Sequence, residues 1–471
     1  MDDPRRAAWL AADAAIEHLA AVPDRPVWQP VAEADRRWLV GQPLPPVGRP
    51  LADLLGEVRE RVLPYPMGNG HPRFFGWVNS PPSLAGVLVA PLAAAMNPSC
   101  AGGEHAGALL ERTAVRWLAE LVGFPHPPGA GLLTSGASMA TVIALATARQ
   151  QAVEDVRETG LYEHRPLAIY MSSEGHSCVR KAAELLGLGG RYIRTVPVDQ
   201  AFRMDIGALR RLIRADQEAG VRPLAVAASA GTVNTGAVDP LGGIADVAAE
   251  HGLWFHVDGA YGALGVLAGS AGARSAYAGM GQADSLALDP HKWLGVPVDV
   301  GCVLFRHPAG PRDAFSLVPP YLRDEGADDL GWFSEYGFEQ TRPFRALRVW
   351  ATIANLGRDG IARLVQNTIG LARSLAAMVD AADDFELLAP AVTSIAAFRY
   401  RPAESGVGTV EALNQAIPAA VQRRGHAFIT GTQLSGTPAL RACILHPDTT
   451  EADLDILLRE IRAAAKEIAL P

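Results

Sequence analysis

A lysine interrupts two apolar runs in the stretch ADSLALDPHKWLGVPVDVGCVLFR, residues 283–306. Lys292 follows the run SLAL and precedes Trp293 and Leu294, so its amine is expected beside low-dielectric surroundings. An amine in an apolar crevice loses its proton more easily and becomes a nucleophile for carbonyl groups. A lone lysine is more often a surface residue, so its neighbours in the fold must decide between the two interpretations.

A carboxylate ends another apolar run. Asp258 follows LWFHV and precedes Gly259 and Ala260. A carboxylate at the end of a buried strand is costly unless it meets a cation or a strong hydrogen-bond donor. Asp258 can cap a local turn, or it can pair with a protonated ring nitrogen of a flat ligand, for which the small Ala260 leaves room.

Small residues follow the apolar run GLLT, in the turn Ser135-Gly136-Ala137-Ser138. Such residues at the start of a helix let backbone N–H groups approach an anion closely, and phosphate is the natural guest. The same residues also permit a plain tight turn. A further alternative is the G-x-S-x-G turn of serine hydrolases with Ser138 as the nucleophile, in which Ala140 replaces the last glycine.

Two other polar residues follow apolar runs. His176 comes after PLAIYMSSEG and directly before Ser177, which we expect to cap the next helix, and Thr232 comes after AVAASAG. A lone histidine is commonly just a hydrogen-bonded loop residue. Because polar residues at the carboxyl ends of parallel strands share one crevice, His176 and Thr232 are expected near Asp258 and Lys292.

Together these residues meet four needs of one cofactor. Lys292 offers an amine for an aldehyde, and Asp258 offers a partner for a pyridine nitrogen. The turn at residues 135–138 and His291 offer a phosphate site, and His176 offers a face for ring stacking. The cofactor that needs all four is pyridoxal 5′-phosphate (PLP). No metal is expected.

The elements that must position these residues alternate between strands and helices from about Gly129. Continuous apolar runs separated by helical patterns predict a largely parallel sheet that is covered on both faces. The predicted strands are GLLTS, PLAIYMS, RYIRTVPV, PLAVAASAG, LWFHVD, DSLALD and VGCVLFR. The connection WLGVPVD is too short for a crossover helix, so the last of these strands is expected to run antiparallel to its neighbour.

The chain of 471 residues is expected to form three parts. Residues 1–85 show helical periodicity and predict an N-terminal helical arm for dimerisation, and residues 86–359 predict the large α/β domain. Residues 360–471 predict a small α+β domain. This last part begins with a long helix from about Gly360 to Ala381 and ends in a helix opened by the capping pattern Thr450-x-x-Asp453.

Composition argues against several classes of protein. The net charge is -8 and no basic stripe is present, so nucleic acid is not an expected partner. The N-terminus lacks the continuous apolar core of a signal peptide, and the run VLVAPLAAAM is too short to span a bilayer, so no membrane contact and a cytoplasmic location are expected. The 4 cysteines show no metal-ligand spacing and are expected to be buried, reduced side chains.

The motifs resemble those of the PLP-dependent amino-acid decarboxylases of the aromatic-L-amino-acid and glutamate decarboxylase group (group II). The resemblance runs from FFGWVNSPPS to CILHP near the C-terminus, and the pair HVDGAYG and DPHKW, with Lys292 34 positions after Asp258, is its most specific part. It implies a PLP-dependent transferase-like fold of the aspartate aminotransferase type, fold type I. That fold comprises a large α/β domain with a mostly parallel sheet, an N-terminal helical arm and a small C-terminal α+β domain.

The resemblance also implies a role for each matched residue. Lys292 would bind the cofactor aldehyde, Asp258 would keep the ring nitrogen protonated, and His176 would stack on the ring. Tyr321, in the stretch SLVPPYLRDEGADDLGW, would return a proton to Cα after decarboxylation. The implied cofactor-binding positions are Gly136, Ala137, Ser138, His176, Thr232, Asp258, Ala260, His291 and Lys292.

At the substrate end the sequence departs from the family. Trp77, Val78 and Ser80 align with positions that hold an aromatic substrate, yet Trp77 is the one aromatic side chain among them. Ser99 lies in a segment that the resemblance assigns to the partner subunit, where the family tends to have bulky aromatics. Arg345 matches a position beside the active site, although a plain salt bridge would explain it equally well.

One residue of the DPHKW motif departs as well. Asp289 stands where the aromatic decarboxylases usually have asparagine. A carboxylate and a phosphate repel each other, so a phosphate contact from this side chain is not expected.

The expected reaction is decarboxylation of an L-amino acid, with an aromatic or other hydrophobic side chain, to an amine and CO2 by a homodimer with shared active sites. In the family a phenylalanine at the position of Tyr321 is associated with oxidative decarboxylation and deamination to an aldehyde, so Tyr321 favours the amine. That oxidative reaction, transamination and aldol-type cleavage remain alternatives with the same cofactor. A serine hydrolase using Ser138 and a non-catalytic relative are alternatives from other classes.

Overall fold

The computed structural model describes residues 3–317, 330–403 and 406–469, which form two compact units. Unit 1 comprises Met1–Pro81, Leu371–Leu388 and Ala396–Pro471, and unit 2 comprises Pro82–Gly370 and Ala389–Ile395. Each unit is described by itself below. The predicted division of the chain into residues 1–85, 86–359 and 360–471 stays a prediction.

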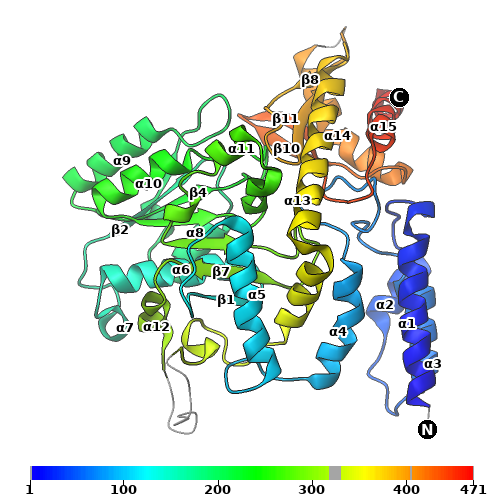
Figure 1. Ribbon diagram of the computed structural model, residues 1–471. Coiled ribbons are helices and arrows are strands. Elements are labelled where there is room, and N and C mark those ends of the chain that lie inside the picture. The colour runs from blue at the N-terminus through cyan, green and yellow to red at the C-terminus, as the bar shows by residue number, and fades with distance from the viewer. Residues whose placement is uncertain (1–2, 318–329, 404–405, 470–471) are drawn as a thin grey trace. The chain divides into compact units, whose positions relative to one another are not determined.

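Unit 2 is built on a seven-stranded sheet with the order β1-β7-β6-β5-β4-β2-β3 (Figure 1). Its strands are β1 (Gly131–Thr134), β2 (Leu167–Ser172), β3 (Ile193–Val196), β4 (Arg222–Ser229), β5 (Trp254–Asp258), β6 (Ser285–Leu288) and β7 (Gly301–Phe305). Strands β2 to β6 pair in parallel, and β7 pairs antiparallel with β1 and β6. All seven predicted strands and the reversed direction of the last one are confirmed.

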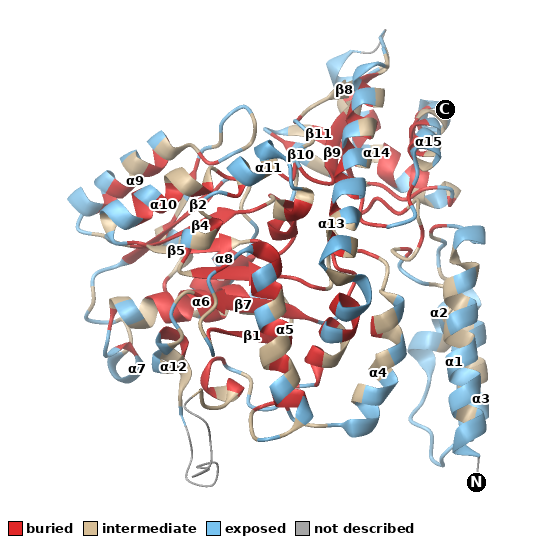
Figure 2. Ribbon diagram, viewed as in Figure 1, coloured by how far each residue is buried: buried red, intermediate tan, exposed pale blue. Residues whose placement is uncertain are grey.

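Helices cover both faces of this sheet. The helices of unit 2 include α4 (Leu84–Met96), α5 (Ala106–Val122), α6 (Ala137–Ala152), α7 (Val156–Thr159), α8 (Cys178–Leu185), α9 (Ile206–Glu218), α10 (Leu241–His251), α11 (Ala271–Ala276) and α12 (Ala309–Phe315). Figure 1 shows the strands between α9 and α10 on one side and α6 on the other. Strands β1, β2, β6 and β7 are buried along their whole length, as continuous apolar runs predict (Figure 2).

Unit 1 contains a four-stranded sheet with the order β10-β11-β9-β8. Its elements are α1 (Pro4–Ala21), α2 (Glu33–Gly41), α3 (Leu51–Glu57), β8 (Phe385–Leu387), β9 (Ile395–Tyr400), α14 (Val407–Arg424), β10 (Thr430–Leu434), β11 (Thr437–Cys443) and α15 (Glu451–Ala469). The start of α15 confirms the predicted capping pattern, because the Thr450 N–H donates to the Asp453 carboxylate at 2.9 Å. Phe398, Leu440 and Ile461 belong to the buried core of this unit.

The long helix α13 (Arg345–Asp380) breaks at Gly357, whose φ of 64° and ψ of 167° are not helical. The part after the break confirms the predicted long helix from Gly360. Among the residues that the structure describes, no helix combines the length and the apolar character that crossing a membrane requires.

Candidate active site

The predicted residues of unit 2 follow five strands that run in the same direction, so they gather at one edge of the sheet. The turn at residues 135–138 follows β1, His176 follows β2, and Thr232 follows β4. Asp258 ends β5, and the residues Asp289 to Lys292 follow β6. The predicted convergence of strand ends is therefore present in the fold.

Asp258 is held from two sides. Its Oδ1 accepts the N–H of Ala260 at 3.1 Å, and the Sγ of Cys178 lies 3.8 Å from its Oδ2. Burial raises the pKa of Cys178 to about 12, and the nearby charge of Asp258 adds to the effect. The thiol therefore stays protonated and donates a hydrogen bond to the carboxylate. Cys178 was not among the predicted site residues, and its only sequence signal is its position two residues after His176.

His176 lies exposed beside this carboxylate. A ring nitrogen of His176, the Sγ of Cys178 and a carboxylate oxygen of Asp258 lie within 4.8 Å of one another. The Nδ1 of His176 accepts the Cys178 N–H at 3.1 Å, so the histidine caps the start of α8. The expectation that Ser177 caps this helix is wrong, because Ser177 itself has helical dihedrals and makes no side-chain capping bond.

A stack of two buried aromatic rings joins the turn after Asp258 to the turn that contains Lys292. The rings of Tyr261 and Trp293 lie 5.1 Å apart at an interplanar angle of 14°. The Trp293 indole N–H donates to the hydroxyl of Thr368 at 3.0 Å. The stack fixes the neighbours of both charged residues and thereby limits how far Asp258 and Lys292 can move.

Lys292 and Asp289 form an ion pair. The Nζ of Lys292 lies 3.0 Å from Oδ2 of Asp289, whose side chain is 5% exposed. The other oxygen, Oδ1, accepts the N–H of Ala137 at 2.7 Å. Asp289, expected only to repel a phosphate, thus links the lysine to the first residue of α6.

The start of α6 offers open hydrogen-bond donors. Its N-cap residue, Gly136, has no side chain to cap the helix. In the part of the chain that the structure describes, the backbone N–H groups of Ser138 and Met139 have no acceptor. Two open N–H groups at a helix start, beside an ammonium group, fit a phosphate. Together with the amine of Lys292 and the carboxylate of Asp258, they fit PLP.

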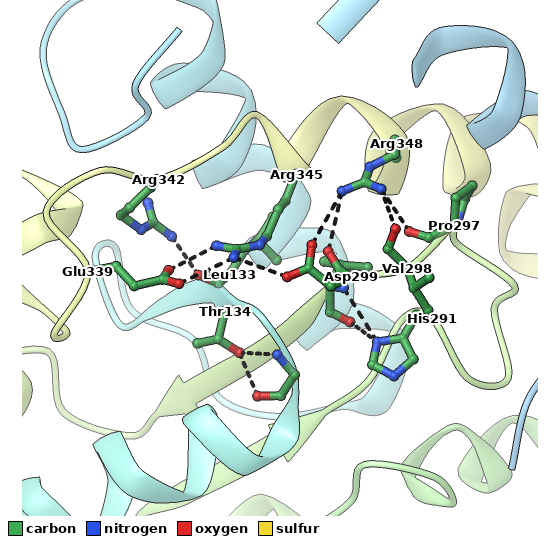
Figure 3. A network of polar contacts seen from close by, with 12 residues as sticks. Leu133, Thr134, His291, Pro297, Val298, Asp299, Glu339, Arg342, Arg345 and Arg348 are labelled. Carbon is green, nitrogen blue, oxygen red and sulfur yellow. Dashed lines mark hydrogen bonds and ion pairs between the residues drawn. The ribbon is translucent and has the colours of Figure 1, made fainter. Parts of the chain in front are cut away.

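The ring of His291 is oriented by the backbone. Its Nδ1 lies 2.6 Å from the carbonyl oxygen of Val300. Figure 3 shows His291 near Asp299 and Val298. Its Nε2 lies 3.8 Å from Oδ2 of Asp289. The imidazole therefore stands close to the start of α6, where the prediction places it.

Thr232 is buried in the turn that follows β4, and its hydroxyl makes hydrogen bonds within that turn. Its Oγ1 accepts the N–H of Ala237 at 3.1 Å and lies 3.0 Å from the hydroxyl of Thr235. A contact of Thr232 with the cofactor stays a prediction. The hydrolase alternative gains no support, because no histidine or carboxylate in the described ranges is hydrogen-bonded to the Ser138 hydroxyl.

Arg345 is held in salt bridges. Its guanidinium lies 2.9 Å from Glu339 and 3.3 Å from Asp299, and Figure 3 shows both carboxylates facing it. The salt-bridge alternative is therefore present, and a substrate contact of Arg345 stays a prediction. Ser99 is exposed, and the next residue, Cys100, donates its N–H to the carbonyl of Arg342 at 2.7 Å.

Trp77, Val78 and Ser80 belong to unit 1. Trp77 has a φ of 46°, a conformation that non-glycine residues rarely adopt and that is common at functional sites. Trp77 is 48% exposed, and the centroid of its ring lies 5.3 Å from that of Phe428. The half-exposed indole is available for a further aromatic contact.

Tyr321 and the acidic residues 324–329 lie outside the described residues. On both sides of this segment, described residues bind one carboxylate, that of Glu335. Ser316 donates its hydroxyl to it at 2.8 Å, and Trp332 donates its N–H at 2.8 Å. The described residues Ser316 and Trp332 are thus held near each other.

Comparison with known proteins places these residues in context. A family model described as the pyridoxal-dependent decarboxylase conserved domain matches residues 36–401. The chain is 32% identical to aromatic-L-amino-acid decarboxylase from Bacillus atrophaeus, over 100% of this chain and 97% of that protein. It is 27% identical to phenylacetaldehyde synthase from Arabidopsis thaliana, over 94% of this chain and 91% of that one. A crystal structure of Oryza sativa TDC with PLP and tryptamine matches with a TM-score of 0.89 and 25% identity, covering 99% of this chain and 98% of that one.

Proposed function

The chain belongs to the pyridoxal-dependent decarboxylase family, and we propose that this PLP-dependent amino-acid decarboxylase converts an aromatic or other hydrophobic L-amino acid to the amine and CO2. One observation supports this most. The carboxylate of Asp258 and the amine of Lys292 follow the neighbouring parallel strands β5 and β6, and the ion pair of Lys292 with Asp289 reaches the start of α6.

Bound PLP supplies an aldehyde for the substrate amino group and a conjugated ring that accepts the electron pair released with CO2. Lys292 provides the amine that holds the cofactor before substrate binds. Asp258, oriented by the Ala260 N–H and the Cys178 thiol, would pair with the ring nitrogen of the cofactor and keep it protonated. His176 packs on the ring face.

The remaining residues bind the phosphate of the cofactor and the amino-acid substrate. The open N–H groups of α6 and His291 bind the phosphate. We assign the substrate to Trp77, Val78, Ser80, Ser99 and Arg345 on the strength of the resemblance. Tyr321 donates the proton to Cα and completes the amine.

A second candidate is oxidative decarboxylation to an aldehyde, favoured by the similarity to phenylacetaldehyde synthase. Free and carrier-bound amino acids, incubated with the holoenzyme with and without oxygen and analysed by mass spectrometry, separate the two. We expect equal amounts of amine and CO2 from one hydrophobic amino acid. Aldehyde together with hydrogen peroxide would instead support the second candidate.

Tyr321→Phe tests the assignment of the proton donor. General acid catalysis contributes a factor on the order of 10²–10⁴ in rate, so the rate of amine formation should fall by about that factor. In the presence of oxygen, CO2 release should persist and the amount of aldehyde should increase. Tyr162→Phe is the matched control, since Tyr162 is 98% exposed. An unchanged rate of amine formation in Tyr321→Phe would remove Tyr321 from the mechanism.

We further propose a homodimer. On α4, Leu84, Leu88, Leu92 and Met96 are spaced four residues apart and are 55%, 55%, 59% and 56% exposed. Residues at this spacing form one helix face. An apolar face of this length at the surface is typical of a protein interface, and a second copy of the chain would cover it.

A further inference from the structure

Asp289 uses two groups that the cofactor also needs. Its Oδ1 accepts the N–H of Ala137, the first residue of α6, at 2.7 Å. Its Oδ2 lies 3.0 Å from the Nζ of Lys292. Because the Asp289 side chain is 5% exposed, water screens these contacts little.

The same carboxylate stands beside the open donors of α6. The N–H groups of Ser138 and Met139 follow that of Ala137 in the first turn of the helix, and within the described ranges they have no acceptor. A phosphate bound to them would lie next to the Asp289 carboxylate. Two anions at one helix start repel each other, and the single ammonium of Lys292 offsets only part of that repulsion.

The ion pair also acts on the lysine. The Nζ of Lys292 is held 3.0 Å from Oδ2 of Asp289 and must leave this contact to reach the aldehyde of the cofactor. Asp289 thus disfavours both the binding of the phosphate and the reaction of Lys292 with the cofactor.

We propose that Asp289 is an internal anion that competes with the cofactor phosphate for the start of α6 and keeps Lys292 in an ion pair until the cofactor binds. This inference rests on the proposed assignment of the cofactor site to these residues. Asp289 is then a residue that sets cofactor affinity low enough for exchange. An asparagine at this position would still accept the Ala137 N–H but would repel no phosphate and form no ion pair with Lys292.

The test compares Asp289→Asn with the parent, both as full chains freed of cofactor. Asp205→Asn is the matched control, because Asp205 caps the start of α9 by accepting the Ala208 N–H at 2.8 Å. Asp289→Ser removes the same charge with a different side chain and guards against a folding defect specific to asparagine. Far-UV circular dichroism verifies that each variant is folded.

Three probes separate the two contacts. Inorganic phosphate, followed by calorimetry, reports on the α6 site alone, and pyridoxal without phosphate, followed by visible absorbance, reports on Lys292 alone. We expect Asp289→Asn to lower the dissociation constants of phosphate and of PLP by about tenfold or more. The reaction with pyridoxal should become several-fold faster, because Lys292 no longer has to leave an ion pair. Asp205→Asn should match the parent within about twofold.

Unchanged or weaker binding of phosphate and PLP in both Asp289 variants would overturn the inference. These measurements need no amino acid, so they are independent of the proposed substrate. Tighter binding in a protein that decarboxylates no tested amino acid would leave the inference standing and count against the proposed function. If the protein decarboxylates an amino acid but its affinity for PLP is the same in the parent and in both Asp289 variants, the proposed function stands and the inference is wrong.

Discussion

At the residue scale, Cys178 is predicted to position Asp258. Cys178→Ala removes the thiol 3.8 Å from the carboxylate, whereas Cys178→Ser keeps a donor there. A hydrogen bond of this kind contributes about 0.5–1.5 kcal/mol, so the alanine variant should bind PLP about 2- to 10-fold more weakly than the parent. The serine variant should retain most of the affinity. A PLP titration followed by visible absorbance measures both.

Cys443→Ala is the control for losing a buried cysteine, since Cys443 lies in β11 of unit 1. If it weakens PLP binding as much as Cys178→Ala does, the effect is one of packing. If serine and alanine at position 178 both match the parent, the thiol does not orient Asp258.

The charged members of the site could be predicted, because each stands where a charge is costly. Lys292 and Asp258 follow apolar runs, and that cost requires an explanation even in a bare sequence. Their contacts could not be predicted. Asp289 and Ala137 are 152 positions apart, and only the fold brings them together. A buried cysteine such as Cys178 gives no sign in the sequence of which carboxylate it will meet.

At the scale of elements, a buried ion pair joins α5 to the segment before α13, and both partners also bind the backbone of β1. Glu111 and Arg342 form the pair, and both side chains are 1% exposed. Glu111 also accepts the N–H of Leu133 at 2.9 Å, and Arg342 also donates to the carbonyl of Cys100 at 2.8 Å. The pair therefore fixes the segment before α5 and the strand that leads into the α6 turn.

Glu111→Leu should lower the free energy of unfolding by about 3–5 kcal/mol, because it leaves the Arg342 guanidinium buried without a counter-charge. Urea unfolding followed by circular dichroism measures the change. The double variant Glu111→Leu with Arg342→Met removes both charges and should recover part of the loss. A double variant that is less stable than Glu111→Leu would show that the hydrogen bonds of Arg342, and not its charge, dominate.

Strands β1, β2, β6 and β7 could be predicted because they are largely apolar and buried along their whole length, whereas Arg194 and Thr195 of β3 are not buried. Helix α4 could not be predicted in the same way. Its sequence LAGVLVAPLAAAM has no polar face, so it shows no helical periodicity. In the structure only Gly86 of this helix is buried, so the core of the chain does not explain its apolar character. A pattern that one chain leaves unexplained points to contacts outside that chain.

At the scale of the whole molecule, each unit contains a buried, neutral histidine. His71 in unit 1 is 2% exposed and His256 in unit 2 is 0% exposed, and burial lowers the pKa of each to about 4. In the unfolded chain a histidine titrates near pH 6.5, so between about pH 6.5 and 4 the unfolded state binds more protons. The stability from neutral burial is therefore complete above pH 6.5 and is lost as the pH falls.

His71→Asn and His256→Asn remove this titration, and asparagine can accept the Arg73 N–H as the Nδ1 of His71 does. Each variant should reduce the slope of unfolding free energy against pH by about 1.4 kcal/mol per pH unit within that window. Burial raises the pKa of Asp239 to about 6 and acts in the opposite direction below pH 6, so variant and parent are compared directly. The exposed His426→Asn is the control. Parallel slopes for parent and variants would contradict the prediction.

The proposed homodimer can be tested on the apolar face of α4. The expected cytoplasmic location stays a prediction. Leu88→Glu with Leu92→Glu places two charges in the middle of this face, where covering a half-exposed leucine contributes roughly 1 kcal/mol. The dimer dissociation constant should rise on the order of 100-fold, as measured by sedimentation equilibrium. Leu185→Glu on α8, where the leucine is 73% exposed, is the control and should leave the dimer intact.

The activity of the same variants decides whether the active sites are shared. If each site needs the partner subunit, the α4 variant should lose decarboxylation in parallel with its dimer and regain both at high protein concentration. The Leu185→Glu control should keep both. A monomeric variant with full activity would show that one chain builds a complete site, and that the α4 face serves assembly alone.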